Sequence, residues 1–137
     1  MPVTAIPDIE KISSDYLRSD AGVVALGARV VGKSPGNTDT PWVRVTQLDA
    51  TSTHRADHLV NYLLQFDSYA GKTGGQPEAN SLGRAVRKAL MQMPDATHTG
   101  AVVTGVQIIG HARIPDTSID EPARERVVIT AQVWAHA

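Results

Sequence analysis

The stretch at residues 58–70 reads HLVNYLLQFDSYA, and large apolar side chains recur in it at every second position. Four of them fall on one side of an extended chain: Val60, Tyr62, Leu64 and Phe66. Successive side chains of a β-strand point to opposite faces, so this spacing indicates a long strand with one apolar face. The other elements of the chain are expected to build a sheet around this strand.

Four further segments have the composition of strands, which we expect at residues 28–33, 42–50, 100–113 and 125–137. The second of them alternates, so that Trp42 and Arg44 point one way while Val43 and Val45 point the other. The last one alternates in the same way, with Val127, Ile129, Ala131 and Val133 on one side.

Two segments have apolar residues at helical spacing, and we expect helices at about residues 8–20 and 77–93. Asp8 is suited to cap the first helix, and Gly22 and Gly27 interrupt the pattern after it. Pro77 suits the first turn of the second helix, and Pro94 is expected to end it. The second helix has a stripe of core residues: Ala79, Leu82, Val86, Ala89, Leu90 and Met93.

The expected element order is α-β-β-β-α-β-β, in which consecutive strands usually pair. The predicted fold is therefore α+β, a mainly antiparallel β-sheet with two helices packed on one face. A length of 137 residues predicts a single domain, residues 1–137.

Composition excludes several classes of protein. The chain has no cysteine, so it has no disulfide framework, thiolate zinc site or cysteine nucleophile. A formal net charge of -1 makes nucleic-acid binding a poor candidate for the main function. No apolar stretch approaches the ~20 residues of a membrane span, and the N-terminal residues do not read as a signal peptide.

The sequence GKTGG, residues 71–75, follows an apolar strand and precedes a helix, which is the order of a phosphate-binding loop. That motif needs a glycine five positions before Gly71, where this chain has Phe66. Two more glycines follow the threonine, so the helix does not begin at the lysine. We expect a strand-to-helix connection without nucleotide binding.

Two other groups of residues could in principle carry chemistry. His54 and His58 are four residues apart, but they lie at a predicted strand start and lack the glutamate of a zinc-protease helix. His98, His111 and His136 are expected to be polar surface residues near strand ends. Carboxylates gather at Asp116, Asp120, Glu121 and Glu125, where prolines and arginines interleave with them, so we expect a solvated or subunit-contacting loop. We therefore expect no catalytic, cofactor or metal site.

Charge is distributed unevenly along the second half of the chain. Residues 71–93 have four basic residues against one acidic residue, and residues 94–137 have five acidic against three basic. The second helix presents Arg84, Arg87 and Lys88 opposite its apolar stripe. Such a basic face is ordinarily the solvated side of an amphipathic helix. The alternative is that the acidic loop, with Asp116, Asp120 and Glu121, or the strand edge beside it meets a neighbouring subunit near these cations.

Four segments together resemble the tail terminator and tail-completion proteins of long-tailed bacteriophages: YLRSDAGVVALGARVVGKSP, PWVRVTQLD, LLQFDSYAG and EANSLGRAVRKAL, at residues 16–35, 41–49, 63–71 and 78–90. The similarity lies in a helix leading into a first strand, a Pro-Trp strand start, and a strand ending in Asp-x-Tyr-Ala. It covers residues 8–135 and consists of packing and turn patterns.

The resemblance implies a structural virion protein at the head–tail interface, assembled in the host cytoplasm. It implies a ring, typically of six subunits, that caps the finished tail tube and joins it to the head connector. Its partners would be other copies of itself, the tail tube protein and the connector or neck protein. DNA would pass through the lumen without sequence-specific binding, and no cofactor, enzymatic activity or membrane is implied. The loops at 33–41 and 113–122 would reach neighbours.

Two alternatives stay open at this point. The first is a head-completion or neck protein of similar size at the head–tail joint. The second is a small-ligand-binding or enzymatic α+β domain, which a deep pocket holding His54, His58 or the carboxylates of residues 116–125 would favour.

Overall fold

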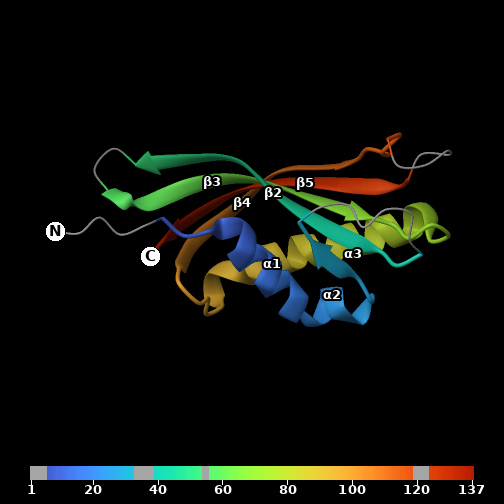
Figure 1. Cartoon of the computed structure of the whole chain (residues 1–137), viewed down its shortest axis with the longest axis horizontal. Helices are drawn as coiled ribbons and strands as arrows, with labels where there is room; N and C mark the ends of the chain where they lie inside the picture. The colour runs from blue at the N-terminus through green and yellow to red at the C-terminus, as the bar shows by residue number, and fades with distance from the viewer. Residues whose placement is uncertain (1–5, 33–38, 54–55, 119–123) are drawn as a thin grey trace.

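A computed structural model of the protein describes residues 6–32, 39–53, 56–118 and 124–137 (Figure 1). The elements follow in the order α1 (Ile9–Ser19), α2 (Ala21–Ala25), β1 (Arg29–Val31), β2 (Trp42–Thr53), β3 (Ala56–Tyr69), α3 (Gly75–Gln92), the 3-10 turn η1 (Met93–Asp95), β4 (Val102–Arg113) and β5 (Arg126–His136). Every predicted helix and strand is present, with ends moved by a few residues.

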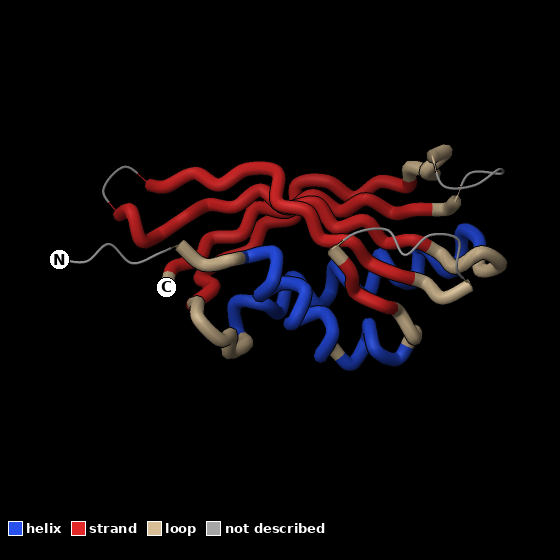
Figure 2. The backbone as a smooth tube through the Cα atoms, in the orientation of Figure 1, coloured by secondary structure: helices blue, strands red, loops and turns tan. Residues whose placement is uncertain are grey.

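The five strands form one sheet in the order β1-β2-β3-β5-β4. β1 runs parallel to β2, and all other neighbours are antiparallel. The helices lie together on one face of this sheet (Figures 1 and 2). The predicted α+β class with a mainly antiparallel sheet is thus confirmed.

The expected pairing of consecutive strands is right for β1–β2, β2–β3 and β4–β5 but wrong for β3–β4. β5 pairs with β3 along Val60–Tyr69, and β4 is left at the edge of the sheet. α3 provides the reason, because it crosses between β3 and β4 and packs on both β3 and β5. The crossover therefore leaves a gap that the last strand fills.

A short helix at Ala21–Ala25 was not predicted, because Gly22 was read as ending the helical pattern. Asp20 explains it. The residue ends α1 with an extended backbone, and its carboxylate accepts a hydrogen bond from the Val23 N–H at 3.1 Å. This is the N-cap arrangement that starts a new helix in a new direction. Gly27, at φ 69°, then turns the chain toward β1.

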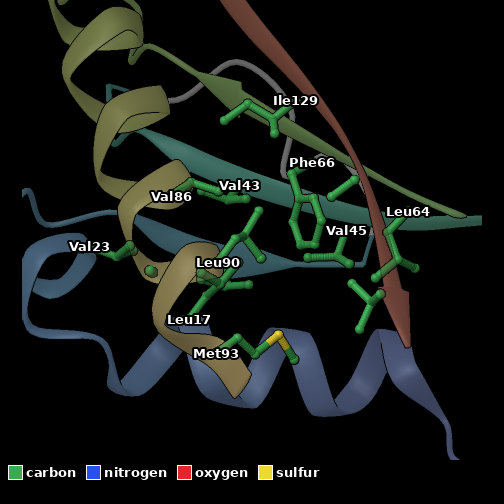
Figure 3. Packing of buried hydrophobic residues seen from close by; sticks show 14 of the residues in the cluster. Leu17, Val23, Val43, Val45, Leu64, Phe66, Val86, Leu90, Met93 and Ile129 are labelled. Atoms are coloured by element: carbon green, nitrogen blue, oxygen red, sulfur yellow. The ribbon is translucent and has the colours of Figure 1, made fainter. Parts of the chain in front are cut away.

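The core lies between the helices and the sheet (Figure 3). The apolar face predicted for β3 is buried, with Val60 at 1% and Leu64 at 0% exposure. The predicted stripe of α3 is also buried, and Leu82 and Val86 are both at 0%. Each such side chain contributes about 1.5–3 kcal/mol of transfer free energy. Gly83 brings α3 so close to β5 that an added Cβ would lie 2.7 Å from Val127 Cγ1.

Candidate functional site

The outward side of α3 has three exposed cations, Arg84, Arg87 and Lys88, next to Met91. Met91 is 64% exposed, and these residues with Gln92 line a shallow hollow of about 470 Å³. None of the three cations forms an ion pair with a carboxylate in the described part of the chain. The three cations are thus exposed on the side of α3 opposite its apolar stripe, as the sequence pattern indicated.

One of these cations also touches the sheet. Arg87 Nη1 lies 3.1 Å from His111 Nδ1 on β4. Partial burial, together with the Arg87 guanidinium, lowers the pKa of His111. A neutral imidazole can accept a hydrogen bond from arginine, so the contact joins α3 to the β4 edge without adding charge. His111 was expected to be an isolated surface residue.

The opposite face of the sheet has a network of charged residues around a carboxylate with 0% exposure, Asp67 on β3. Arg44 Nη2 on β2 donates to Asp67 Oδ2 at 3.0 Å, and Arg126 Nη1 on β5 lies 4.0 Å from Oδ1. Gln65 Nε2 donates to the same Oδ1 at 2.9 Å. A buried carboxylate persists only when it is paired and hydrogen-bonded, and here three strands supply the partners.

The network continues to the segment that follows β4. The Tyr69 hydroxyl donates to Asp116 Oδ2 at 2.7 Å, and Arg126 Nη1 lies 3.7 Å from the same oxygen. Burial opposes ionisation of Asp116, but hydrogen bonds from Ser118 and Tyr69 outweigh it and lower its pKa to about 2. Burial and the bond to Asp116 raise the pKa of Tyr69 to about 12. Trp42 stacks on the Tyr69 ring at 3.8 Å.

These contacts change how the predicted interface residues can be used. The charge of Asp116 is satisfied within its own subunit, on the sheet face opposite α3. Asp120 and Glu121 lie outside the described residues. Asp116 and the three cations of α3 therefore lie on opposite sides of the sheet, and the expected contact between subunits stays a prediction. Sequence reasoning did not identify Arg44, Asp67 or Arg126, although each lies on the polar side of its strand.

A second hollow, of about 450 Å³, lies between α1 and residues 97–100. Beside it the Tyr16 hydroxyl donates to Ala89 O at 2.7 Å, and His98 Nε2 lies 2.8 Å from Met93 O. The two rings meet edge to face at 5.3 Å. His98 is thus half-buried and packs α1 against the end of α3, which differs from the expected surface role.

The possible metal site at His54 and His58 can be compared with the structure only in part. The side chains of His54 and His58 fall outside the described residues. Within the described ranges, no three His, Cys, Asp or Glu side chains gather as a metal site would require.

In the GKTGG stretch, the Gly71 N–H donates to a carboxylate oxygen of Glu78 on α3. An added Cβ at Gly71 would also clash with the carbonyl of Asp39, so the backbone is closely approached there. The backbone N–H that a phosphate would need is therefore already hydrogen-bonded to a carboxylate. This arrangement is that of a strand-to-helix connection held by a hydrogen bond between Gly71 and Glu78.

Comparison with known proteins finds a similar fold in a solved structure. A chain of a structure titled "Virion of native gene transfer agent (GTA) particle" has the same fold, with a TM-score of 0.66 and 16% identity. The similarity covers 94% of this chain and 95% of that one, and at this identity it concerns the fold. No curated protein matches the chain.

The family described as Tail completion protein gp17 matches residues 15–136. The chain belongs to this family, as the sequence resemblance predicted, and it is a structural protein of a bacteriophage-type virion tail. Among its described helices, none combines the length and the apolar character that crossing a membrane requires.

Proposed function

We propose that the protein forms a closed ring, of six subunits, that caps the finished tail tube and joins it to the head connector. The family description, tail completion, supports a role at the end of tail assembly. The similar fold of a chain in a gene transfer agent virion supports use of this architecture within a particle. The role is structural and requires no catalytic group or cofactor.

The observation that carries the proposal is the difference between the two edges of the sheet. One edge is β1, a strand of three residues, and the other is β4, a strand of twelve. A two-fold dimer uses the same patch twice, whereas a ring requires two different surfaces that meet head to tail. Unlike edges at the two sides of one subunit favour the second arrangement.

The β2–β3 hairpin supports contact with a second protein. Its far end extends well past the helices (Figure 1), and β2 and β3 pair from Trp42–Tyr69 out to Thr53–Ala56. The end of a hairpin that extends beyond the core does not pack against it, so its residues can contact another protein. In the proposed ring, six such arms point to the same side, toward the tail tube or the connector.

The test is to mix the purified protein with polymerised tail tubes and image them by negative-stain electron microscopy, alongside native mass spectrometry of the protein alone. We expect a six-subunit species and density at one end of each tube. Binding along the tube walls, or a protein that stays monomeric both alone and with tubes, would contradict the proposal.

A further inference from the structure

One side of the sheet has an edge that β1 covers only in part. β1 pairs with Trp42–Arg44, so from Val45 onward the outer side of β2, away from β3, has no paired strand within the described part of the chain. Glu10 of α1 lies there, and its Oε2 accepts a hydrogen bond from the Gln47 N–H at 2.7 Å.

The residues that follow on β2 add an apolar side chain and a second carboxylate to this edge. Leu48 lies at a register shift and is 49% exposed, and Asp49 beside it is exposed. Glu10, Leu48 and Asp49 are called the acidic edge below.

The other side of the sheet ends in β4, and α3 lies against it. Ile109 lies at a register shift in β4 and is 50% exposed. Two residues later His111 contacts Arg87 of α3, and one helical turn beyond Arg87 is the exposed Met91. Below, the term basic edge means the residues Arg84, Arg87, Lys88, Met91 and Ile109.

We propose that the basic edge of one subunit docks on the acidic edge of a second copy of this chain. The inference rests on the proposed ring and names its subunit contact. Each edge has at least one exposed apolar side chain beside charges of one sign, and the two signs are opposite. The edges lie on opposite sides of the sheet, so the contact can repeat from subunit to subunit, which builds a ring when the rotation between subunits closes.

The contact is made by side chains more than by continued strand pairing. Glu10 already occupies one outward N–H of β2, and register shifts interrupt both strands near Leu48 and Ile109. Such irregularities and edge charges discourage edge-to-edge pairing of strands. The apolar side chains at these shifts are left free to pack against each other between the subunits.

Cross-linking tests the contact directly, because the chain has no native cysteine. A Leu48→Cys chain is mixed with an Ile109→Cys chain at micromolar concentration and oxidised, alone and at the ends of tail tubes. Docking raises the effective concentration of the two thiols to about millimolar, so we expect on the order of tenfold more cross-linked dimer than with the control pair. The control replaces Leu48→Cys by Val24→Cys, which is 55% exposed on α2.

A charge exchange gives independent evidence. Arg87→Asp alone and Asp49→Arg alone should each weaken self-association on the order of tenfold, and the two together should restore most of it. Circular dichroism should show that all three chains fold. If rings form but the two cysteines do not cross-link and the charge exchange does not change self-association, this contact is wrong and the ring proposal stays intact. A wild-type chain that associates nowhere would overturn both.

Discussion

Replacing Gly83 by alanine tests how closely α3 packs on the sheet. The added Cβ would lie 2.7 Å from Cγ1 and 3.0 Å from Cβ of Val127, which is 1% exposed on the interior strand β5. Carbon atoms prefer separations of about 3.5–4.0 Å, so helix and strand must move apart by roughly 1 Å. Val127 is β-branched and has little freedom to rotate away.

The size of the effect follows from two opposing terms. Overpacking a core of this kind costs about 1–3 kcal/mol, and the stiff neighbour puts Gly83→Ala in the upper half of that range. Alanine in place of glycine inside a helix returns up to ~1 kcal/mol. The net loss should be about 1–2 kcal/mol, which lowers the melting temperature by roughly 4–8 °C in a chain of this length.

Thermal melts followed by circular dichroism measure the loss, with Val127→Ala as the matched background. That change removes Cγ1, the closest atom, so Gly83→Ala should lower the melting temperature much less there, with a coupling of about 1 kcal/mol. An unchanged or raised melting temperature for Gly83→Ala in the wild-type background would refute the close approach of α3 to β5.

Three further expectations follow. Leu82→Ala should lower the free energy of unfolding by ~2–5 kcal/mol because Leu82 is fully buried. Arg87→Ala should change it by no more than about 0.5 kcal/mol in the isolated subunit. The reverse order in thermal melts would mean that α3 packs through its other face. Isothermal calorimetry with magnesium and ATP or GTP should give no binding heat, and a micromolar affinity lost on Lys72→Ala would contradict the hydrogen-bonded connection at Gly71. The lowered pKa of Asp116 stabilises the fold above pH ~4, and this stabilisation is lost as pH falls toward about 2. Asp116→Asn should therefore flatten that part of the acid-unfolding curve, and equal slopes in both proteins would speak against the network.

The period of the apolar pattern explains why most of the fold could be predicted. The faces of β3 and α3 follow from spacings of two and of three to four, and these spacings are independent of distant parts of the chain. The position of β5 between β3 and β4 could not be derived in this way, because it depends on where the α3 crossover delivers the chain.

The polar network was missed for the same reason. Arg44 and Asp67 are direct neighbours across a hairpin, a pairing that could have been recognised from two long consecutive strands. Arg126 joins them only through the β3–β5 register, which no local pattern encodes. The interface expectation stays a prediction, and charge counts could not reveal that Asp116 is already paired inside its own subunit.

The strand order also bears on how the protein is made. β5 is synthesised after every other strand, yet it lies between β3 and β4. Until it leaves the ribosome, β3 has one open edge and β4 has no neighbouring strand at all. Both would then present long rows of unpaired backbone groups, which invite aggregation. The sheet can therefore close only once β5 has left the ribosome, and until that point we expect the nascent subunit to depend most on chaperones.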